Sequence, residues 1–367
     1  MPKMCWTATS GEIEHVAITL EELGGWPFVL GRLSQRAYLT SAEAAAALAD
    51  VFQGNATPSQ LAAFIFGLRC KGETVDEMTG LVWAMLEAAE RVPIHDELRE
   101  RLVDTCGTGG DRSGTINIST IAAFVVAGAG VPVCKHGGRA ASSKAGSADL
   151  LEALGVAIEL GPRAVARCIE EAGIGFCFAP RFHQSMRYAV PVRRELGVAT
   201  VFNFLGPLAN PARVRRQVVG VSDPGMAEKM IGVLRANGAR HTLVVFGHDG
   251  LDELTTTDTS TVLEYHDGIV RTYVVDPVEL GLTKAGRSEL LGAEAPRNAE
   301  LARRVLGGEK GPHRDIVILN AAAGIVAAGN AVDLIDGLVK AADAIDAGEA
   351  ERRLLRLAEV SQAEAGR

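Results

Sequence analysis

The 367-residue chain lacks an uninterrupted apolar run of the roughly 18 residues that a membrane-spanning helix requires. Its start also lacks the apolar core of a signal peptide, because Glu12, Glu14 and Glu21 fall where that core would lie. Both absences argue against a membrane as a partner. We expect the protein to work in the cytoplasm.

Concentrated positive charge is missing as well. The 37 Lys and Arg residues are scattered along a chain whose net charge is −8, and they form no basic arm or stripe. Binding to nucleic acid usually depends on such a patch. Nucleic acid is therefore not an expected partner.

Spaced cysteine pairs are the third absence. The chain has six cysteines, and no two of them have the spacing of a zinc-binding or redox motif. A chain of this length with 47% hydrophobic residues can bury a large core without disulfides. We expect the cysteines to be small buried apolar side chains.

The segment from about Trp26 to Glu90 is typical of consecutive helices. Capping boxes, in which a Thr and a Glu or Gln three residues later satisfy the first N–H groups, mark three helix starts: Thr40 with Glu43, Thr57 with Gln60, and Thr74 with Glu77. Gly54 and Gly72 are expected to end helices. A helical repeat of apolar residues predicts one buried stripe, made of Leu61, Phe64, Ile65 and Leu68. Such a bundle could serve as core, dimer interface or both.

From residue 102 onward, short apolar runs alternate with helical segments. The predicted strands are 102–106, 131–134, 156–160, 175–179, 217–221 and 242–246. Predicted helices include 118–128, 162–173 and 226–238, and residues 331–365 read as an amphipathic helical tail. This alternation predicts the α/β class: a small N-terminal helical domain plus a larger α/β domain with a central mixed, partly parallel sheet. The boundary is expected near residues 92–98.

The sequence Gly-Thr-Gly-Gly-Asp at 107–111 follows a predicted strand and soon enters a helix near Asn117. Glycines bring backbone N–H groups close to a ligand, and a helix N-terminus adds free N–H groups and a positive dipole end. It is not a dinucleotide fingerprint, since Arg112 takes the third glycine position, and no Lys-Ser/Thr follows as in a Walker A loop. By itself it also fits a plain tight turn. It indicates a phosphate or pyrophosphate site.

A second polar loop, residues 135–147, follows the next predicted strand and contains three cationic side chains, three glycines and three serines. In it, Lys135 supplies a point charge, while Ser142 and Ser143 donate hydrogen bonds. A single loop of this kind could simply be solvated. Two such loops on successive strands should converge at the carboxyl end of the sheet.

A third loop carries the adjacent carboxylates Asp252 and Glu253 after the strand at 242–246. Beside a phosphate site these acids would repel one another unless a cation bridges them, and hard oxygen ligands together with phosphate select Mg²⁺. An isolated acid pair is more often solvated, but a third polar loop at the same sheet end favours one shared site.

A fourth segment, residues 181–194, places several arginines beside apolar and aromatic side chains. It suits an aromatic carboxylate held by an Arg. The competing interpretation is that these are surface arginines of a helix that pair with Glu195.

Taken in order, these segments resemble those of the anthranilate phosphoribosyltransferase family. The likeness runs from about Trp26 to the C-terminal helix and includes residues 176–183 and the Asn-Phe-Leu-Gly-Pro sequence at 203–207. The resemblance implies a glycosyltransferase that moves the 5-phosphoribosyl group from phosphoribosyl pyrophosphate (PRPP) to the amine of anthranilate and releases pyrophosphate, a step of tryptophan biosynthesis.

The resemblance also implies the domain roles and partners. We expect a loosely ordered extension at 1–25, a helical domain at 26–95 joined by part of 185–210, and an α/β domain at 96–367 that binds PRPP. The family forms homodimers through the helical domain, acts on small molecules, and uses Mg²⁺, here expected as two ions.

The site residues follow by resemblance. PRPP would be contacted by Gly107, Gly110, Asp111, Thr115, Asn117, Ser119, Thr120, Lys135, Ser142, Ser143 and Ser147. Ser119 and Glu253 would hold one Mg²⁺, and Asp252 with Glu253 a second. The aromatic acceptor would be contacted by Gly107, His136, Gly138 and Arg193, with Arg193 on its carboxylate.

The donor's chemistry sets what these residues must do. The anomeric carbon becomes positive as pyrophosphate departs, so the leaving anion needs stabilisation by Mg²⁺, Lys135 and backbone amides. An aryl amine is already neutral near physiological pH. We therefore assign no catalytic acid or base and treat His136 as a positioning residue.

Other functions stay open at this point. Gly138 stands where the family usually has Asn and Gln184 where it usually has Pro, so a paralogue acting on a different aminobenzoate or aromatic acceptor is one alternative. A nucleoside phosphorylase-like enzyme is another, although it would have little use for the Asp252–Glu253 pair. A non-catalytic paralogue would have lost the phosphate and metal residues, which are present here.

Overall fold

The structure, a computed structural model, describes residues 18–140 and 144–366. Most of the expected N-terminal extension, residues 1–17, and the two loop serines Ser142 and Ser143 lie outside the described residues. The described part of the chain begins with a turn that leads into a helical bundle of α1 (Gly25–Ser34), α2 (Ser41–Phe52), α3 (Pro58–Lys71) and α4 (Val75–Ala88).

The local signals of the helical bundle are confirmed. All three capping boxes form, with each Thr side chain accepting from the N–H of the residue three positions later. Gly72 follows α3 with a φ of 86°, which glycine adopts without strain. The predicted stripe on α3 is buried in full, as Leu61, Phe64, Ile65 and Leu68.

The larger part of the chain is built on one seven-stranded sheet with the order β3-β2-β1-β4-β5-β6-β7. The strands are β1 (Val103–Gly107), β2 (Val133–Gly137), β3 (Ile174–Phe178), β4 (Arg216–Gly220), β5 (His241–Gly247), β6 (Ser260–His266) and β7 (Ile269–Val275). The first five strands are parallel, and β6 and β7 run antiparallel. The predicted mixed sheet is confirmed.

Two strand predictions differ from the structure. The segment 156–160 is not a strand, although Val156, Ile158 and Leu160 are buried in the alternating fashion that suggested one. Its backbone is held instead by the C-terminal helix, because the Ala157 N–H donates to Ser361 Oγ at 3.0 Å. The hairpin of β6 and β7 was not predicted at all.

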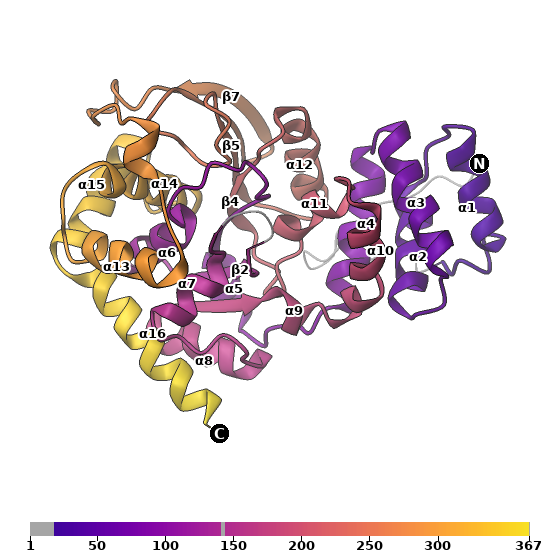
Figure 1. Ribbon diagram of the computed structural model, residues 1–367, viewed down its shortest axis with the longest axis horizontal. Coiled ribbons are helices and arrows are strands. Elements are labelled where there is room, and N and C mark those ends of the chain that lie inside the picture. Colours follow the sequence, from indigo (N-terminus) through magenta and orange to yellow (C-terminus); the bar gives the residue numbers. More distant parts are fainter. Residues whose placement is uncertain (1–17, 141–143, 367) are drawn as a thin grey trace.

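Helices cover the sheet on both faces (Figure 1). They are α5 (Asp96–Arg101), α6 (Ile118–Gly128), α7 (Ser147–Ala153), α8 (Pro162–Ala172), α9 (Ala179–Phe182), α10 (Val190–Leu196), α11 (Phe202–Leu205), α12 (Pro224–Ala236), α13 (Ala295–Leu306), α14 (Pro312–Ala327), α15 (Leu334–Asp346) and α16 (Glu349–Ala365), with short 3₁₀ turns at Gln184–Tyr188, Gly206–Leu208 and Arg287–Leu290. The predicted tail helix is thus two helices, which Gly348 separates with a φ of 73°.

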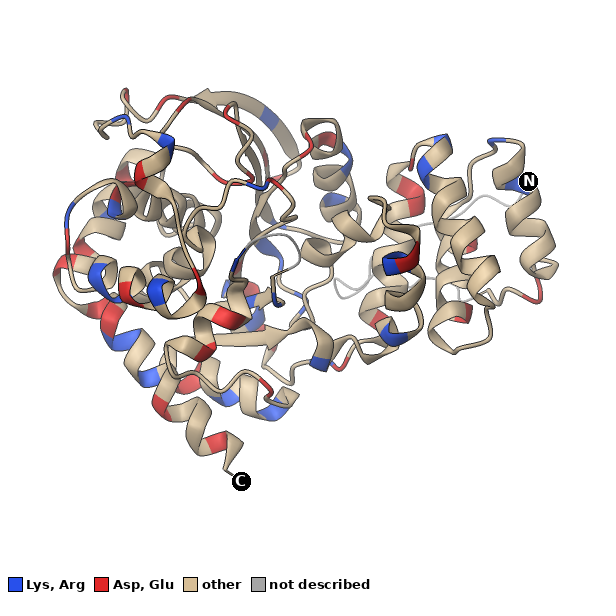
Figure 2. Cartoon of the chain, viewed as in Figure 1, with Lys and Arg blue, Asp and Glu red and all other residues tan. Residues whose placement is uncertain are grey.

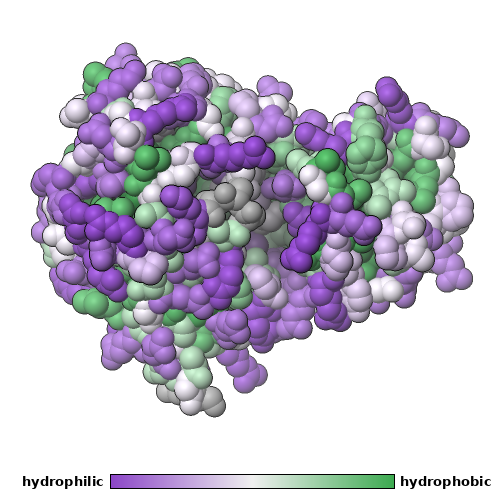
Figure 3. Space-filling model, viewed as in Figure 1, coloured by the Kyte–Doolittle hydropathy of each residue, from purple (hydrophilic) through white to green (hydrophobic). Residues whose placement is uncertain are grey.

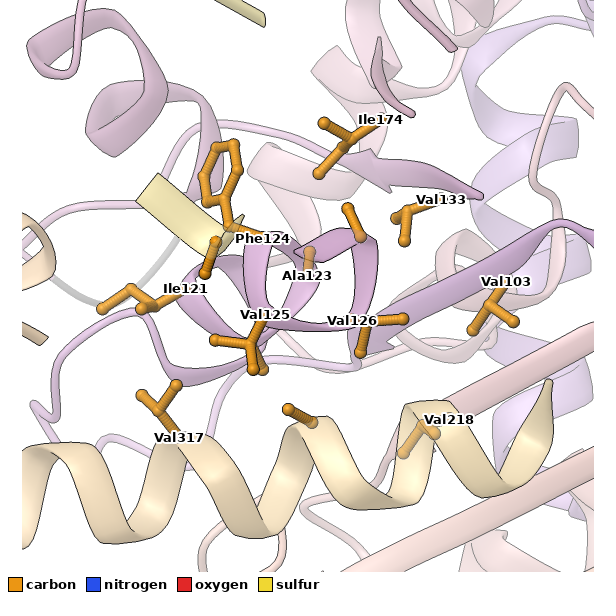
Figure 4. Packing of buried hydrophobic residues seen from close by; sticks show 14 of the residues in the cluster. Val103, Ile121, Ala123, Phe124, Val125, Val126, Val133, Ile174, Val218 and Val317 are labelled. Atoms are coloured by element: carbon orange, nitrogen blue, oxygen red, sulfur yellow. The ribbon is translucent and has the colours of Figure 1, made fainter. Parts of the chain in front are cut away.

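One core lies between the sheet and α6, α14 and their neighbours. Figure 4 shows Val126 of α6 on the side of this helix toward Val103 of β1 and Val218 of β4, whereas Phe124 lies on the other side; all four are buried. This nearly uninterrupted apolar helix fixes the position of its own N-terminus at the carboxyl end of the sheet. That end is where the polar loops lie.

A second core joins the opposite face of the sheet to the helical bundle. It contains Val219 and Val244 from the sheet, residues of α12, and the buried side chains of α1 to α4. Residues from the connection 189–208, such as Val192 and Phe202, belong to the same core. In Figure 1, α10 and α11 accordingly lie next to α3 and α4.

The surface agrees with the expectations about charge. Acidic and basic residues are interspersed over both parts of the molecule (Figure 2). No helix among the described residues is long and apolar enough to cross a membrane. Of the cysteines, Cys106, Cys134, Cys168 and Cys177 are buried as predicted, whereas Cys70 is exposed and Cys5 lies outside the described residues.

Candidate active site

A cavity of about 800 Å³ opens at the carboxyl ends of β1, β2 and β5, next to the N-terminus of α6. Figure 3 shows the surface hollowed between the helical part and the larger part. The residues predicted for the site that line this cavity are Gly107, Gly110, Asp111, Thr115, Asn117, Ser119, Thr120, Lys135, His136, Gly138, Ser147, Asp252 and Glu253. Three separate loops therefore meet, as their positions after the strands predicted.

Two glycines allow the acidic loop to close onto the first polar loop. A Cβ on Gly220 would lie 1.6 Å from the Asp252 carbonyl oxygen, and one on Gly107 would lie 2.6 Å from Asp252 Oδ2. Any larger residue at 220 would push the acidic loop away. With glycine there, the Gly109 N–H donates to Asp252 Oδ2 at 2.7 Å.

Asp252 and Glu253 are both buried, with 8% and 9% of their surfaces exposed. The Ser119 N–H, at the N-terminus of α6, donates to Glu253 Oε1 at 3.2 Å. Burial raises the pKa of Asp252 well above its usual range, and the neighbouring Glu253 charge adds to the shift. Burial likewise raises the pKa of Glu253 to about 7, although Lys135 and the hydrogen bonds from Ser119 oppose the rise. The protein thus holds two carboxylates whose charge it compensates only in part.

Lys135 lies below these acids and is itself buried. Its ammonium donates to the Thr105 carbonyl oxygen and lies 3.5 Å from Ser119 Oγ. It also faces Asp104, whose pKa burial raises and Lys135 lowers. The charge of Lys135 is therefore shared between the site and a buried carboxylate beneath it.

The rest of the second loop contributes less charge than its composition suggested. Arg139 pairs with Asp149 at 2.9 Å and also with Glu152, and its guanidinium lies over the Phe178 ring. The Thr120 hydroxyl donates to Ser147 Oγ at 2.9 Å. Two residues predicted to contact PRPP thus hold each other in place.

The side chain of Asn117 is held by two hydrogen bonds within the protein. Its amide donates to the Ala145 carbonyl oxygen at 2.8 Å and its Oδ1 accepts from Asn298 at 3.1 Å. The side chain therefore ties the second loop to the start of α6.

His136 is buried on the cavity wall next to His183, with ring centroids 5.0 Å apart. Burial lowers the pKa of His136 to about 3 and that of His183 to about 4. Both imidazoles are hence neutral at physiological pH. Because Nδ1 of His136 lies 3.1 Å from the Gly206 carbonyl oxygen, it carries the proton, and Nε2 is an acceptor without a partner among the described residues.

Arg193 is the one predicted site residue among those described that does not line the cavity. It sits on α10, with its guanidinium 5.2 Å from the centre of the Phe202 ring, and burial lowers its pKa. The cavity wall begins one turn later, at 197–199. Of the other polar residues in this segment, Arg181 and Gln184 both donate to Glu90 rather than into the cavity.

Three further residues of the site were missed from the sequence. Arg69 reaches the cavity from α3 of the helical bundle and lies 3.7 Å from the buried Glu73. Ser222 also lines the cavity and donates to the Gly109 carbonyl oxygen at 3.0 Å. Asp104 accepts from Asn210 at 2.8 Å beneath Lys135. A charged residue within an apolar strand was the available signal for Asp104.

The chain matches two family models. Residues 99–351 match the model described as "Glycosyl transferase family, a/b domain", and residues 29–89 match "Glycosyl transferase family, helical bundle domain". Together they span the architecture described above.

Curated relatives and solved structures agree with this assignment. The chain is 51% identical over 331 residues to the anthranilate phosphoribosyltransferase of Symbiobacterium thermophilum, covering 90% of this chain and 96% of the relative. It is 51% identical over 342 residues to that of Rhodococcus jostii, covering 92% and 93%.

Among solved structures, the enzyme of Thermus thermophilus superimposes with a TM-score of 0.85 at 42% identity, covering 91% of this chain and 99% of that one. The Saccharomyces cerevisiae enzyme in complex with PRPP and Mg gives 0.82 at 27% identity, covering 92% and 98%. The chain belongs to the anthranilate phosphoribosyltransferase family.

Proposed function

We propose that the protein transfers the 5-phosphoribosyl group from PRPP to the amine of anthranilate and releases pyrophosphate. The observation that carries this proposal is one cavity in which a glycine-rich loop, a helix N-terminus, a buried Lys and a buried acid pair meet. Such a wall matches a highly charged phosphate donor bound with a divalent cation.

The residues at the acid pair fit Mg²⁺. Their donor atoms are carboxylate and hydroxyl oxygens, which Mg²⁺ prefers. The raised pKa values of Asp252 and Glu253 also reflect negative charge that the protein compensates only in part. We assign one ion to Ser119 and Glu253 and a second to Asp252 and Glu253. When bound, Mg²⁺ would neutralise charge on the pyrophosphate.

The protein's own groups would hold the donor in line for the transfer. The 107–111 loop and the N-terminus of α6 offer backbone N–H groups to the phosphates, and Lys135 supplies the fixed positive charge below them. Of the polar residues predicted for this half of the site, those that the structure describes, such as Asp111, Thr115 and Ser147, border the same cavity. Fixed dipoles of this kind stabilise the departing anion without reorganising.

The acceptor half is assigned to Gly107, His136, Gly138 and Arg193. The free Nε2 of neutral His136 is suited to accept a hydrogen bond from the aromatic amine, which positions its lone pair for attack. No proton needs to leave the amine before attack, because an aryl amine is neutral at physiological pH. Arg193 would hold the carboxylate, and for this its side chain must turn from the Phe202 ring toward the cavity.

A relaxed choice of acceptor is the second candidate function. A Cβ on Gly138 would meet no atom of the described residues within 4 Å, and a larger side chain would fit among those residues. We propose that anthranilate is used and that ring-substituted aminobenzoates are also accepted.

The domain division and assembly complete the proposal. We assign residues 26–95, with part of 185–210, to a helical domain and residues 96–367 to the PRPP-binding domain, and we propose a homodimer through the helical domain. Tyr38 and Phe66 of that domain have 61% and 47% of their surfaces exposed. Exposed aromatic side chains of this kind support the proposal that a second copy of the chain packs against this domain. Light scattering on the purified protein tests the dimer.

The function itself is tested by supplying either the reactants of the proposed transfer or those of a nucleoside phosphorylase. PRPP, Mg²⁺ and anthranilate should yield pyrophosphate, and omission of any one should abolish its release. If the protein instead cleaved a nucleoside in the presence of orthophosphate and left PRPP intact, the nucleoside phosphorylase alternative would replace the proposal.

A further inference from the structure

A cluster of metal-ligating side chains lies at the opposite end of the sheet from the cavity. His241 is the first residue of β5 and His266 the last residue of β6, and the two are direct partners in the antiparallel ladder. Glu264 lies two residues before His266 and therefore points to the same face of the sheet. The potential ligand atoms of these three residues all lie within 4.8 Å of one another.

The contacts within this His–Glu–His cluster are already close. His241 Nε2 lies 2.7 Å from Glu264 Oε1, and the rings of His241 and His266 stack with their centroids 4.0 Å apart. Tyr273, on β7, is near the Glu264 carboxylate, and each side chain shifts the pKa of the other. Polar groups around a metal site help to orient its ligands.

We propose that this cluster binds one Zn²⁺ ion through His241, Glu264 and His266, with water in the fourth position. Two imidazoles and one carboxylate form a common protein ligand set for Zn²⁺, whereas Mg²⁺ prefers oxygen ligands alone. The ion joins the ends of β5 and β6 and stabilises the antiparallel part of the sheet.

Binding requires one movement. The two rings are 11° from parallel, so His266 must rotate before a nitrogen of each ring can point at the same ion. Half of the His266 side chain is exposed, which permits this rotation, whereas His241 is buried and stays fixed. Zn–ligand bonds of about 2.0 Å in a tetrahedral site place the ligand atoms roughly 3.3 Å apart, so Glu264 Oε1 must also move slightly away from His241 Nε2, which is now 2.7 Å from it.

The site is independent of the Mg²⁺ site. β5 runs from His241 to Gly247, and the loop with Asp252 follows its other end, so the two sites are separated by the length of the strand, about 20 Å. Occupancy by Zn²⁺ should therefore leave PRPP-dependent turnover in excess Mg²⁺ unchanged while raising the melting temperature.

Metal titration of the full-length protein tests this proposal. Metal-free protein is titrated with Co²⁺ in millimolar Mg²⁺, because four-coordinate Co²⁺ with imidazole ligands absorbs strongly in the visible range and six-coordinate Co²⁺ at the all-oxygen acid pair does not. We expect one equivalent of absorbing Co²⁺, displaced by one equivalent of Zn²⁺.

Variants identify the ligands. His266→Ala removes a half-exposed ring and Glu264→Gln removes the carboxylate charge, and each should weaken Zn²⁺ binding at least tenfold. His95→Ala, at an exposed histidine elsewhere, should bind as wild type. Absence of the strong Co²⁺ absorption, or equal Zn²⁺ affinity in wild type and both ligand variants, would overturn the proposal and show the cluster to be a hydrogen-bonded stack alone.

Discussion

Replacing the acid pair by its amides, Asp252→Asn with Glu253→Gln, separates the metal site from the fold. Both carboxylates are more than 90% buried, and each accepts a backbone N–H, from Gly109 and from Ser119. The amide oxygens of Asn and Gln can accept the same bonds, so the loop should keep its place. Because burial raises the pKa of both acids, their removal relieves charge repulsion, and the metal-free variant should melt no lower than wild type.

Activity should respond in the opposite way. Without the carboxylates, the charge of the pyrophosphate stays uncompensated in a buried cavity, and we expect turnover to fall about a thousandfold or more, or about 4 kcal/mol in the activation barrier. The assay is pyrophosphate release over a range of Mg²⁺ concentrations. Asp96→Asn with Glu97→Gln makes the same chemical change at an exposed acid pair and should have no effect. Near-normal turnover in the Asp252–Glu253 variant would refute the metal assignment.

Four further changes have defined outcomes. Arg193→Ala should raise the KM for anthranilate about ten- to a hundredfold, from the loss of roughly 1.5–3 kcal/mol, and leave PRPP affinity by calorimetry unchanged; an equal loss of PRPP affinity would contradict its role. Gly138→Asn should improve kcat/KM for anthranilate or narrow the panel of accepted aminobenzoates, and if it does neither, Gly138 is a neutral replacement. Gly220→Ala must displace the Asp252 loop and should cost about 1–3 kcal/mol of stability and raise the Mg²⁺ requirement, measured by melting and by Mg²⁺ titration. Finally, burial lowers the pKa of His136 from an ordinary 6.5 to about 3, so the stability that the neutral imidazole contributes is complete above pH 6.5 and is lost as the pH falls toward 3; about 3 kcal/mol of it should be gone at pH 4.5. Denaturant unfolding of His136→Gln should therefore show a free energy of unfolding that falls less steeply with acid than in wild type. An unchanged dependence on pH would mean that the imidazole is not held neutral.

Local signals in the sequence predicted the helical bundle well. Each capping box is a short-range arrangement, so Thr40, Thr57 and Thr74 could be identified without knowing the fold. The meeting of the polar loops could also be predicted without the full fold. Parallel strands place their carboxyl ends at the same edge of a sheet, whatever the order of the strands.

Strand predictions failed where the deciding contact was distant in sequence or where a signal was overlooked. Residues 156–160 alternate like a strand, but their backbone is engaged by Ser361, some two hundred residues later. The hairpin of β6 and β7 turns at Asp267 and Gly268, which have φ angles of 50° and 83°. Asp-Gly between β-branched runs is a strong hairpin signal and could have revealed it.

Within the site, residue types were easier to predict than their orientations. Lys135 was identified as a cation near the phosphates, but its hydrogen bonds beneath the site depend on strand pairing that composition does not encode. Arg139 was counted with the cations of the loop, but its guanidinium forms ion pairs with Asp149 and Glu152 of the following helix, α7. Arg193 illustrates the same limit, because only the fold places its guanidinium over Phe202.

Transfer of the phosphoribosyl group to anthranilate can be measured by following anthranilate fluorescence in the presence of PRPP and Mg²⁺. We expect the fluorescence to fall as the amine is substituted, one pyrophosphate to be released for each anthranilate consumed, and chelation of Mg²⁺ to stop both. Stable anthranilate fluorescence with active, folded protein and both reactants in excess would contradict the proposed transfer.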